Sequence, residues 1–259
     1  MFHVADDVVC LRTLIANVCL IGRTGEDGWV LVDAGVPYST AIILRAVRGR
    51  FGAERPPRAI LLTHGHFDHV GALAQLAGRW DVPIYAHELE LPYLTGGADY
   101  SPPDPSVGGG LMAWISPLYP RRAMDLGARV HALPRGGEVP GLPGWRWIHT
   151  PGHTNGHVSF FRERDRVLIA GDAFTTVEQE SALAVLSQRK KVHGPPAYFT
   201  TDWRAAEESV RRLQALKPAV AATGHGVPME GDALARGLLL LAQHFERFAI
   251  PPHGRYVPH

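Results

Sequence analysis

Residues 63–69 read Thr-His-Gly-His-Phe-Asp-His and concentrate four side chains that can bind a metal ion. His64 and His66 are two residues apart, so an extended backbone would direct both imidazoles to the same side. The glycine between them adds no bulk and permits a sharp turn of the chain. Asp68 and His69 cannot share that side unless the chain bends, so the segment predicts two adjacent metal sites.

The types of these side chains indicate which metal they would hold. Imidazole and carboxylate ligands together suit zinc, and they suit manganese or iron less decisively. The alternative interpretation is a polar loop that contains histidines by chance, and the dense spacing makes it weak. We therefore expect two divalent metal ions, zinc in preference to manganese or iron.

This stretch resembles the His-x-His-x-Asp-His signature of the metallo-β-lactamase superfamily. The resemblance predicts three more ligands downstream, each just after a strand. Three segments match in order, namely Thr150-Pro151-Gly152-His153-Thr154, Ile169-Ala170-Gly171-Asp172 and Thr223-Gly224-His225-Gly226. The resemblance runs from the first strands to His225, and it matches all seven ligands of the family.

The resemblance implies how the ligands divide between two metals. Metal one would be held by His64, His66 and His153, and metal two by Asp68, His69 and His225. Asp172 would bridge them, because a carboxylate offers two oxygens and a neutral imidazole offers a single lone pair. Adjacent metals can share a hydroxide whose pKa falls from about 15.7 to roughly 7, which would be the nucleophile. Asp68 could also relay a proton to the leaving group.

The resemblance implies a hydrolase, and Asp172 narrows the branch. True β-lactamases of this superfamily lack the bridging aspartate, whereas glyoxalase II-like thioesterases, lactonases and RNase Z-like phosphodiesterases share it. Only one helix and a tail follow His225, where glyoxalase II has a glutathione-binding domain. We therefore expect attack on an ester-like carbonyl, in a thioester or a lactone. The alternatives are an RNase Z-like phosphodiesterase and a mononuclear iron enzyme similar to persulfide dioxygenases.

Composition restricts the class of partner. The 259 residues are 46% hydrophobic and carry a formal net charge of +1. A substantial core is therefore expected, and a small-molecule substrate is favoured over nucleic acid or a membrane. The apolar run Gly237–Ala242 is too short to cross a bilayer. The first residues do not read as a signal peptide.

The two cysteines bear on the compartment. Cys10 and Cys19 lie in apolar, strand-like stretches, and we expect both to be buried, reduced thiols. Reduced thiols fit a reducing compartment. The sequence therefore favours a cytoplasmic protein.

Hydrophobic periodicity predicts alternating strands and helices. Strands are expected at 8–21 (two runs), 29–33, 59–62, 83–86, 126–133, 145–149, 157–162, 167–171 and 219–222. Helices are expected at 39–50, 70–76, 87–94, 178–189, 203–216 (with Asp202 as N-cap) and 231–248. A hairpin turn is expected at 25–28, and His259 is expected to be incidental. The family resemblance implies an α/β fold, a four-layer αββα sandwich of two mixed β-sheets, in a single domain spanning 1–259.

Several residues are expected to surround the metals without binding them. Asp33 follows a predicted strand, and the resemblance implies that it supports a ligand from beneath; a turn-capping role is the alternative. His149 and His157 flank His153 and are expected to be structural or supporting. His87 is expected to cap or pack at a strand–helix junction.

The segment at about 95–120 is rich in proline, glycine and aromatic residues and has no periodicity. It is expected to be a lid over the substrate or a contact in a homodimer; a surface excursion without a chemical role is the alternative. The predicted pocket wall comprises Tyr100, Trp114, Tyr119, His193, Tyr198 and Phe199. The basic run Arg189–Lys191 is expected to be a solvated face in preference to an anion site.

Overall fold

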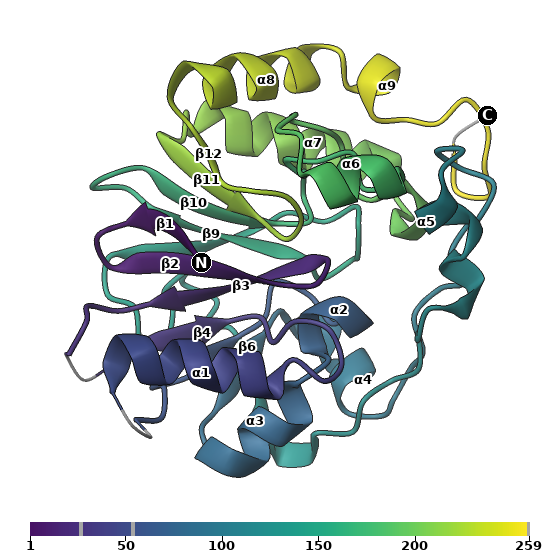
Figure 1. Cartoon of the computed structure of the whole chain (residues 1–259). Coiled ribbons are helices and arrows are strands. Elements are labelled where there is room, and N and C mark those ends of the chain that lie inside the picture. The colour runs from purple at the N-terminus through teal and green to yellow at the C-terminus, as the bar shows by residue number, and fades with distance from the viewer. Residues whose placement is uncertain (26–27, 53–54, 258–259) are drawn as a thin grey trace.

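The computed structural model describes residues 1–25, 28–52 and 55–257. Residues 26 and 27, at the centre of the predicted hairpin turn, lie outside the described residues, and so does His259. Within the described residues the chain forms two β-sheets with helices on their outer faces (Figure 1). This arrangement confirms the predicted αββα sandwich.

The first sheet contains seven strands among the described residues, in the order β1-β2-β3-β4-β5-β6-β7. Pairing is antiparallel from β1 to β4 and parallel from β4 to β7, so the sheet is mixed. The strands are β1 (Phe2–Ala5), β2 (Val8–Thr13), β3 (Ala16–Ile21), β4 (Val30–Val32), β5 (Ile60–Leu61), β6 (Ile84–Ala86) and β7 (Val130–Ala132).

The second sheet contains five strands in the described part of the chain, in the order β12-β11-β10-β9-β8. The β10–β11 pair is parallel and the other pairs are antiparallel. The strands are β8 (Trp145–His149), β9 (Val158–Arg162), β10 (Val167–Gly171), β11 (Val220–Thr223) and β12 (Met229–Glu230).

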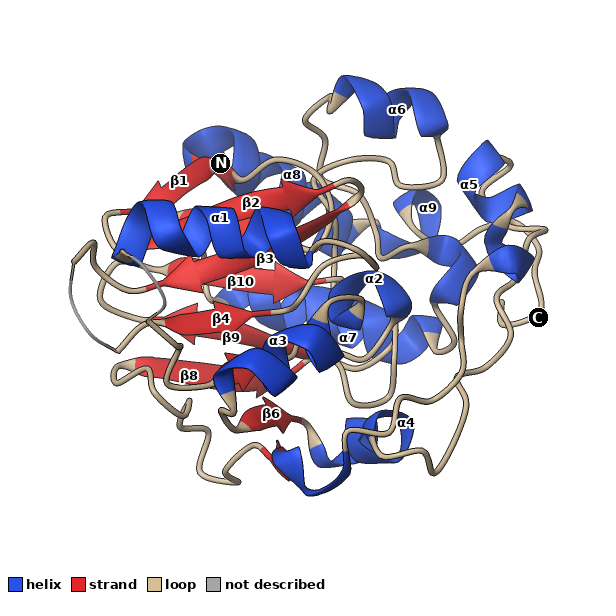
Figure 2. Ribbon diagram, turned by 60° about the horizontal axis from the view of Figure 1, so that its bottom comes forward, coloured by secondary structure: helices blue, strands red, loops and turns tan. Residues whose placement is uncertain are grey.

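Helices cover the outer face of each sheet (Figure 2). The first sheet packs on α1 (Thr40–Phe51) and α3 (Leu73–Trp80), and the second on α7 (Trp203–Ala215) and α8 (Gly231–Gln243). Strand alternation separates the layers: on β2, Val9 and Leu11 pack toward the helices, while Val8 and Cys10 join the core between the sheets. The short helices are α2 (Phe67–Val70), α4 (Leu91–Leu94), α5 (Leu111–Trp114), α6 (Ala182–Ser187) and α9 (Phe245–Phe248).

The predicted helix at 70–76 is interrupted, because tertiary hydrogen bonds capture its backbone. The N–H of Gly71 donates to Gly35 O at 2.7 Å and that of Ala72 to Ala34 O at 3.2 Å. Neither N–H is then available to an intrahelical carbonyl. Two helices therefore replace the predicted one: α2 begins at Phe67, before the predicted start, and carries Asp68 and His69, and α3 runs to Trp80, beyond the predicted end.

Two other predicted elements are shorter than expected. The helix predicted at 178–189 begins only after Ser181, whose hydroxyl accepts from Ala184 N. It ends at Ser187, because the next residue, Gln188, has φ +51°. The strand predicted at 126–133 begins with a 3-10 turn at Gly127–Arg129, and only Val130–Ala132 pair as β7. The predicted N-cap of α7 is confirmed, since Asp202 Oδ1 accepts from Ala205 N at 2.9 Å.

The prediction of reduced cysteines is wrong, because Cys10 and Cys19 form a disulfide bond. In the β2–β3 hairpin Cys10 lies directly opposite Cys19, and such pairs bring their Cβ atoms close together. The cytoplasmic prediction therefore loses the cysteine argument on which it partly rested. Among the described helices, none combines the length and hydropathy that a membrane crossing requires.

The flap at 95–120 contains the helix α5 and a 3-10 turn at Ser116–Leu118, in place of the expected irregular chain. It packs against the segment after β10, through Asp104 N to Tyr198 O at 2.8 Å and Met112 N to Glu180 O at 3.3 Å. These contacts make the flap a partly packed cover beside the second sheet.

Candidate metal centre

The predicted ligands all lie at or just beyond strand ends, and they come from both sheets. His64 and His66 lie in the loop after β5 and Asp68 and His69 in α2, so these four belong to the first sheet. The second sheet contributes the remaining three, with His153 after β8, Asp172 after β10 and His225 after β11. Side chains beyond the carboxyl ends of strands are a favoured place for a ligand site in α/β folds.

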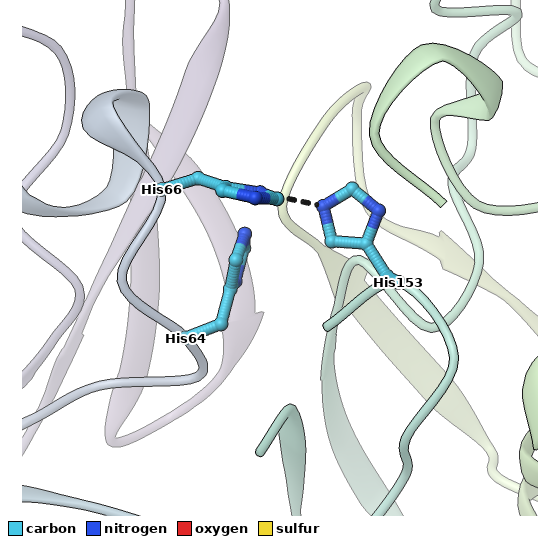
Figure 3. Close-up of side chains that lie close together, drawn as sticks. All are labelled: His64, His66 and His153. Carbon is cyan, nitrogen blue, oxygen red and sulfur yellow. Dashed lines mark hydrogen bonds between the residues drawn. The ribbon is translucent and has the colours of Figure 1, made fainter. Parts of the chain in front are cut away.

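The structure brings these side chains together in the described part of the chain as three overlapping buried groups. In each group the ligand-type atoms lie within 4.8 Å of one another. The groups are His64, His66 and His153; Asp68, His69 and His225; and His64, His69 and Asp172. Figure 3 shows the first group, in which His153 faces His66 and His64 from the opposite sheet. These groups correspond to the two predicted ligand sets and the predicted bridge.

The atoms in this centre fit bound metal ions better than they fit one another. His64 Nε2, His69 Nε2 and Asp172 Oδ1 are buried and have no hydrogen-bond partner among the described residues. Buried polar atoms are rarely left in that state unless an ion or water satisfies them. His66 Nδ1 and His153 Nε2 lie 3.0 Å apart. Two nitrogens bound tetrahedrally to zinc at about 2.0–2.1 Å are separated by about 3.3 Å, which is close to this spacing.

Asp172 lies between the two ligand sets. Its Oδ2 is 3.1 Å from His225 Nε2, 3.5 Å from His153 Nε2 and 3.6 Å from His69 Nε2. Its backbone N–H donates to His157 Nε2 at 2.8 Å, which gives the flanking histidine a supporting contact. The carboxylate can therefore reach both halves of the centre.

Two glycines are required for this close packing. A Cβ on Gly171, whose φ is +55°, would lie 2.5 Å from His157 Nε2. A Cβ on Gly224 would lie 1.9 Å from Asp172 Oδ1. Neither position could carry a larger residue without displacing the aspartate or its support.

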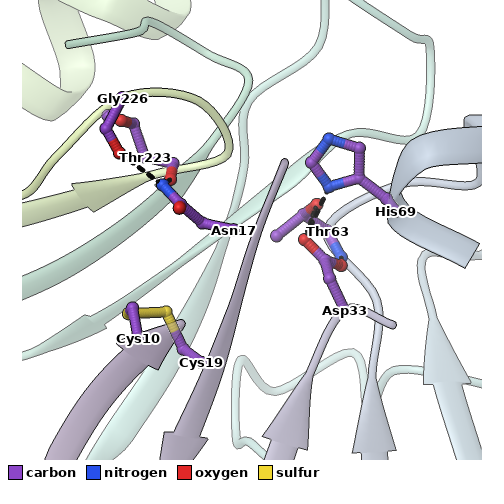
Figure 4. The surroundings of a disulfide bond; sticks show 8 residues. All are labelled: Cys10, Asn17, Cys19, Asp33, Thr63, His69, Thr223 and Gly226. Atoms are coloured by element: carbon purple, nitrogen blue, oxygen red, sulfur yellow. Dashed lines mark hydrogen bonds and ion pairs between the residues drawn. A yellow bond between two sulfur atoms is a disulfide. The ribbon is translucent and has the colours of Figure 1, made fainter. Parts of the chain in front are cut away.

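Asp33 lies beneath the half formed by Asp68, His69 and His225. Its Oδ2 is 2.8 Å from His69 Nδ1, and both of its oxygens accept from Thr63, from the hydroxyl and the backbone N–H, each at 2.8 Å (Figure 4). A carboxylate on the far nitrogen of a metal-binding imidazole fixes the ring and leaves Nε2 free for the metal. Asp33 therefore orients His69.

Asn17 holds the loop that carries His225, and sequence analysis did not single it out. Its Nδ2 donates to Thr223 O at 2.8 Å and Gly226 O at 2.6 Å, across the two sheets (Figure 4). His225 Nδ1 is in turn 2.8 Å from Ile15 O. The β2–β3 hairpin of the first sheet thus orients a ligand from the second. A buried polar residue inside an apolar strand was the only available signal.

The histidines of the other half have neutral neighbours. His64 Nδ1 is 3.1 Å from Thr63 Oγ1, and His153 Nδ1 is 3.4 Å from Thr200 Oγ1. The ring of His66 lies between aromatic side chains, with its centroid 4.5 Å from that of Tyr100 and 4.4 Å from that of Phe199. No described carboxylate contacts these rings on the side away from the centre.

Electrostatics differs between the two halves. Burial lowers the pKa of His64 and His66 well below the usual histidine value and that of His153 to about 4. Burial also opposes protonation of His69 and His225, but the Asp172 carboxylate outweighs it and raises both pKa values. The pKa of Asp172 stays well below its usual value, because His225 and His69 outweigh the effect of burial.

Some of the predicted pocket residues lie beside the metal centre and others do not. Tyr100 and Phe199 line a small cavity of about 30 Å³ beside His66 and His153. Tyr198 is buried next to it, 5.9 Å from Tyr119 between ring centroids.

Two pocket predictions are corrected. Trp114 is 72% exposed, because α5 turns its neighbour Ala113 inward and Trp114 outward. His193 pairs with Thr175 through two backbone hydrogen bonds and lines a separate cavity of about 380 Å³ under α8. Lys190 and Lys191 of the basic run lie at that second cavity, away from the metal centre.

His87 behaves as predicted. It is the N-cap of a 3-10 turn, where its Nδ1 accepts from Leu89 N at 3.2 Å. Its ring stacks on His149 with centroids 4.2 Å apart. His149 is thus structural as well.

Comparison with known proteins agrees with this fold. A family profile described as the metallo-beta-lactamase superfamily matches residues 11–225. The chain belongs to the metallo-beta-lactamase superfamily and is a metal-dependent hydrolase.

Three individual proteins are informative. The probable metallo-hydrolase YflN of Bacillus subtilis is 49% identical over 242 residues, which are 93% of this chain and 92% of that protein. The hydroxyacylglutathione hydrolase GloC of Haemophilus influenzae is 32% identical over 117 residues, which are 44% of this chain and 49% of that protein. The crystal structure of TTHA1623 in a di-iron-bound form is similar with a TM-score of 0.58 and 29% identity, and covers 89% of this chain and 97% of that one.

Proposed function

We propose that this hydrolase uses a dinuclear metal centre to cleave an ester-like carbonyl, in a thioester or a lactone. The observation that carries the proposal is the position of Asp172, whose Oδ2 is within 3.6 Å of histidines from both ligand sets. When bound, two such ions supply a nucleophile from water near neutral pH and polarise the scissile carbonyl. Zinc is the proposed metal, and the di-iron form of TTHA1623 makes iron the main alternative.

The side chains beside the centre favour an acyl substrate. Tyr93, Tyr100 and Phe199 give the cavity aromatic walls, and no lysine or arginine is among its described lining residues. Such walls suit an acyl group or a lactone ring better than a polyanionic phosphodiester. Asp68, whose pKa is raised by burial, is the candidate for passing a proton to the leaving group.

The small size of this cavity adds a conformational change to the proposal. A volume of about 30 Å³ is far below the roughly 300–1,000 Å³ of typical ligand pockets. We therefore propose that the flap at Tyr100–Ser101, or the loop at Thr154–Asn155, moves away from the centre to admit the substrate. When the flap is the part that moves, it acts as a lid, and the hydrogen bond from Tyr100 to Glu90 breaks as it opens.

The likeness to GloC supports a thioester, although it covers less than half of either chain. The proposed partner is a small molecule, because the net charge of +1 provides no general attraction to nucleic acid or to an anionic membrane. A cytoplasmic location and a homodimer remain part of the proposal. The cytoplasmic location no longer has the support of reduced cysteines.

A substrate screen tests the proposal. Thioesters, lactones, phosphodiesters and a chromogenic β-lactam would be compared on protein loaded with zinc, manganese or iron, with metal content measured in parallel. We expect two metals per chain and the highest kcat/KM on a thioester or a lactone. Dominant phosphodiester turnover, or one iron per chain with oxygen uptake on a persulfide, would overturn it.

A further inference from the structure

Glu90 is a fully buried carboxylate outside the proposed ligand set. It is 0% exposed and lies at the end of the 3-10 turn Glu88–Glu90, just before α4. Four described groups donate hydrogen bonds to it, two to each oxygen. Oε1 accepts from Thr154 Oγ1 at 2.6 Å and Gly156 N at 3.1 Å, and Oε2 accepts from Gly65 N at 3.0 Å and from Tyr100 Oη.

Three of these four donors belong to segments that carry metal-one ligands. Gly65 is the residue between His64 and His66, in the loop of the first sheet. Thr154 directly follows His153, in the loop of the second sheet. Glu90 therefore joins, through one carboxylate, the two loops that bring three imidazoles together from opposite sheets.

The fourth donor links the centre to the flap. Tyr100 donates its hydroxyl to Glu90, and its ring lies 4.5 Å from the ring of His66. The ring of Tyr100 also stacks on that of Tyr93, with centroids 4.0 Å apart. Glu90 thus also holds the flap residue that closes over His66.

The backbone around Glu90 is shaped for this contact. A Cβ on Gly156 would lie 2.7 Å from Glu90 Cγ and 2.8 Å from Oε1. A Cβ on Gly65 would lie 2.5 Å from Tyr100 Oη. The second loop therefore needs glycine where it approaches the carboxylate, and the first needs glycine where it approaches the Tyr100 hydroxyl that bonds to the carboxylate.

The charge of Glu90 has no basic partner among the described contacts. Burial raises the pKa of Glu90, and the hydrogen bonds from Thr154, Tyr100, Gly65 and Gly156 oppose that rise. Four donors aimed at two oxygens match an ionised carboxylate, because a protonated one would have to donate in turn. Such a buried charge is costly unless positive charge lies near it, and two divalent ions in the adjacent centre would supply it.

We propose that Glu90 is a positioning residue for metal one, which holds the loops of His64–His66 and of His153 in register and keeps Tyr100 closed over His66. The proposal rests on the dinuclear centre. It differs from a general structural role because it predicts a loss confined to one half of that centre. Outer partners of metal-binding groups commonly contribute about 10- to 100-fold to metal affinity.

The experiment compares Glu90→Gln with Glu180→Gln. Glu180 is also a buried carboxylate, 3% exposed, and accepts a backbone hydrogen bond from Ala197 at 2.8 Å, but it contacts no proposed ligand. Metal-free protein would be titrated with Zn²⁺ against a chelating indicator. His153→Ala and His225→Ala variants would assign the two binding steps to metal one and metal two.

We expect Glu90→Gln to weaken the metal-one step by about 10- to 100-fold and the metal-two step by less than about threefold. Glu180→Gln should change neither step. Equal losses at both steps, or an unchanged metal-one step, would overturn the proposal. Wild-type protein that binds no metal would instead refute the dinuclear centre itself.

Milder variants keep the proposal testable if Glu90→Gln does not fold. Tyr100→Phe and Thr154→Val each remove one donor and preserve the shape of the side chain. Each should weaken the metal-one step selectively, by a smaller factor than Glu90→Gln. The absence of any selective effect in both variants would count against the proposal.

Discussion

The two halves of the metal centre are built differently. His64, His66 and His153 form an all-imidazole half whose pKa values are lowered by burial. The other half contains Asp68, and its histidines His69 and His225 have raised pKa values because carboxylates outweigh their burial. The first half presents neutral imidazoles that need not lose a proton to bind metal, whereas the second offers negative charge that attracts a cation.

The buried carboxylates that support the two halves, Asp33 and Glu90, also differ. Asp33 contacts the His69 ring directly, at 2.8 Å, and so acts on a single ligand. Glu90 contacts no imidazole and acts through the backbone of Gly65 and Gly156. In the charged half a carboxylate therefore contacts a ligand ring directly, while in the neutral half the buried carboxylate contacts only the loops that carry the ligands.

The largest effect is expected from a substitution of Asp172, the residue that the two halves share. Asp172→Ala should lower turnover of the best substrate by about a hundredfold or more, because both halves lose a carboxylate oxygen. Steady-state kinetics and metal content per chain would measure it, with thermal unfolding as the control for folding. Unchanged turnover would mean that Asp172 does not join the halves.

The next effect should be confined to the charged half. Asp33→Asn keeps an acceptor for Thr63 but replaces the carboxylate beside His69 with an amide. The affinity for metal two should fall about 10- to 100-fold, while metal one changes little. The Zn²⁺ titration described for Glu90 measures both steps. A loss at metal one of the same size would remove the distinction between the halves.

A smaller effect is expected from the disulfide of the β2–β3 hairpin, which also carries Asn17 (Figure 4). Replacing both cysteines by serine should lower the free energy of unfolding by about 2 kcal/mol, since a short loop is no longer closed in the unfolded chain. Metal-two affinity should fall less than about threefold, because Asn17 keeps its hydrogen bonds. Urea unfolding and the same titration test this, and a larger loss at metal two would show that the hairpin needs its cross-link.

The smallest expected effect is on the pH dependence of the stability of the metal-free protein. The pKa of Glu90 is raised above 4.5, mainly by burial, so the folded state binds this proton more tightly than the unfolded state. Its contribution to stability is present below pH 4.5 and is lost as pH rises through the folded pKa. The free energy of unfolding of the wild type, less that of Glu90→Gln, should therefore decrease as pH rises from 4.5 through the folded pKa of Glu90. A difference that rises with pH would show that the hydrogen bonds to Glu90 outweigh the effect of its burial. The titratable side chains that face Glu90 are Tyr100 and Tyr93.

The ligand set was predictable because most of its information is local. His64, His66, Asp68 and His69 stand out by their spacing within one short segment, whereas Asp172 was assigned through the family resemblance, from a segment that matches it in order. The layered αββα fold was implied by the family resemblance, while hydrophobic alternation and helix periodicity predicted the individual strands and helices. Element lengths were less predictable, since Gly71 bonds to a distant carbonyl and thereby ends α2 early.

The supports could not be predicted, because they arise where distant segments meet. Asn17 reaches Thr223 across 206 positions and Glu90 reaches Gly156 across 66, and no local pattern records such pairings. The exposure of Trp114 was likewise decided by how α5 packs. By itself the sequence determined which side chains can bind metal and in what order they occur, because covalent spacing limits where neighbours can point. Only the tertiary structure decided which buried groups hold those side chains in place, because that depends on how the two sheets face each other.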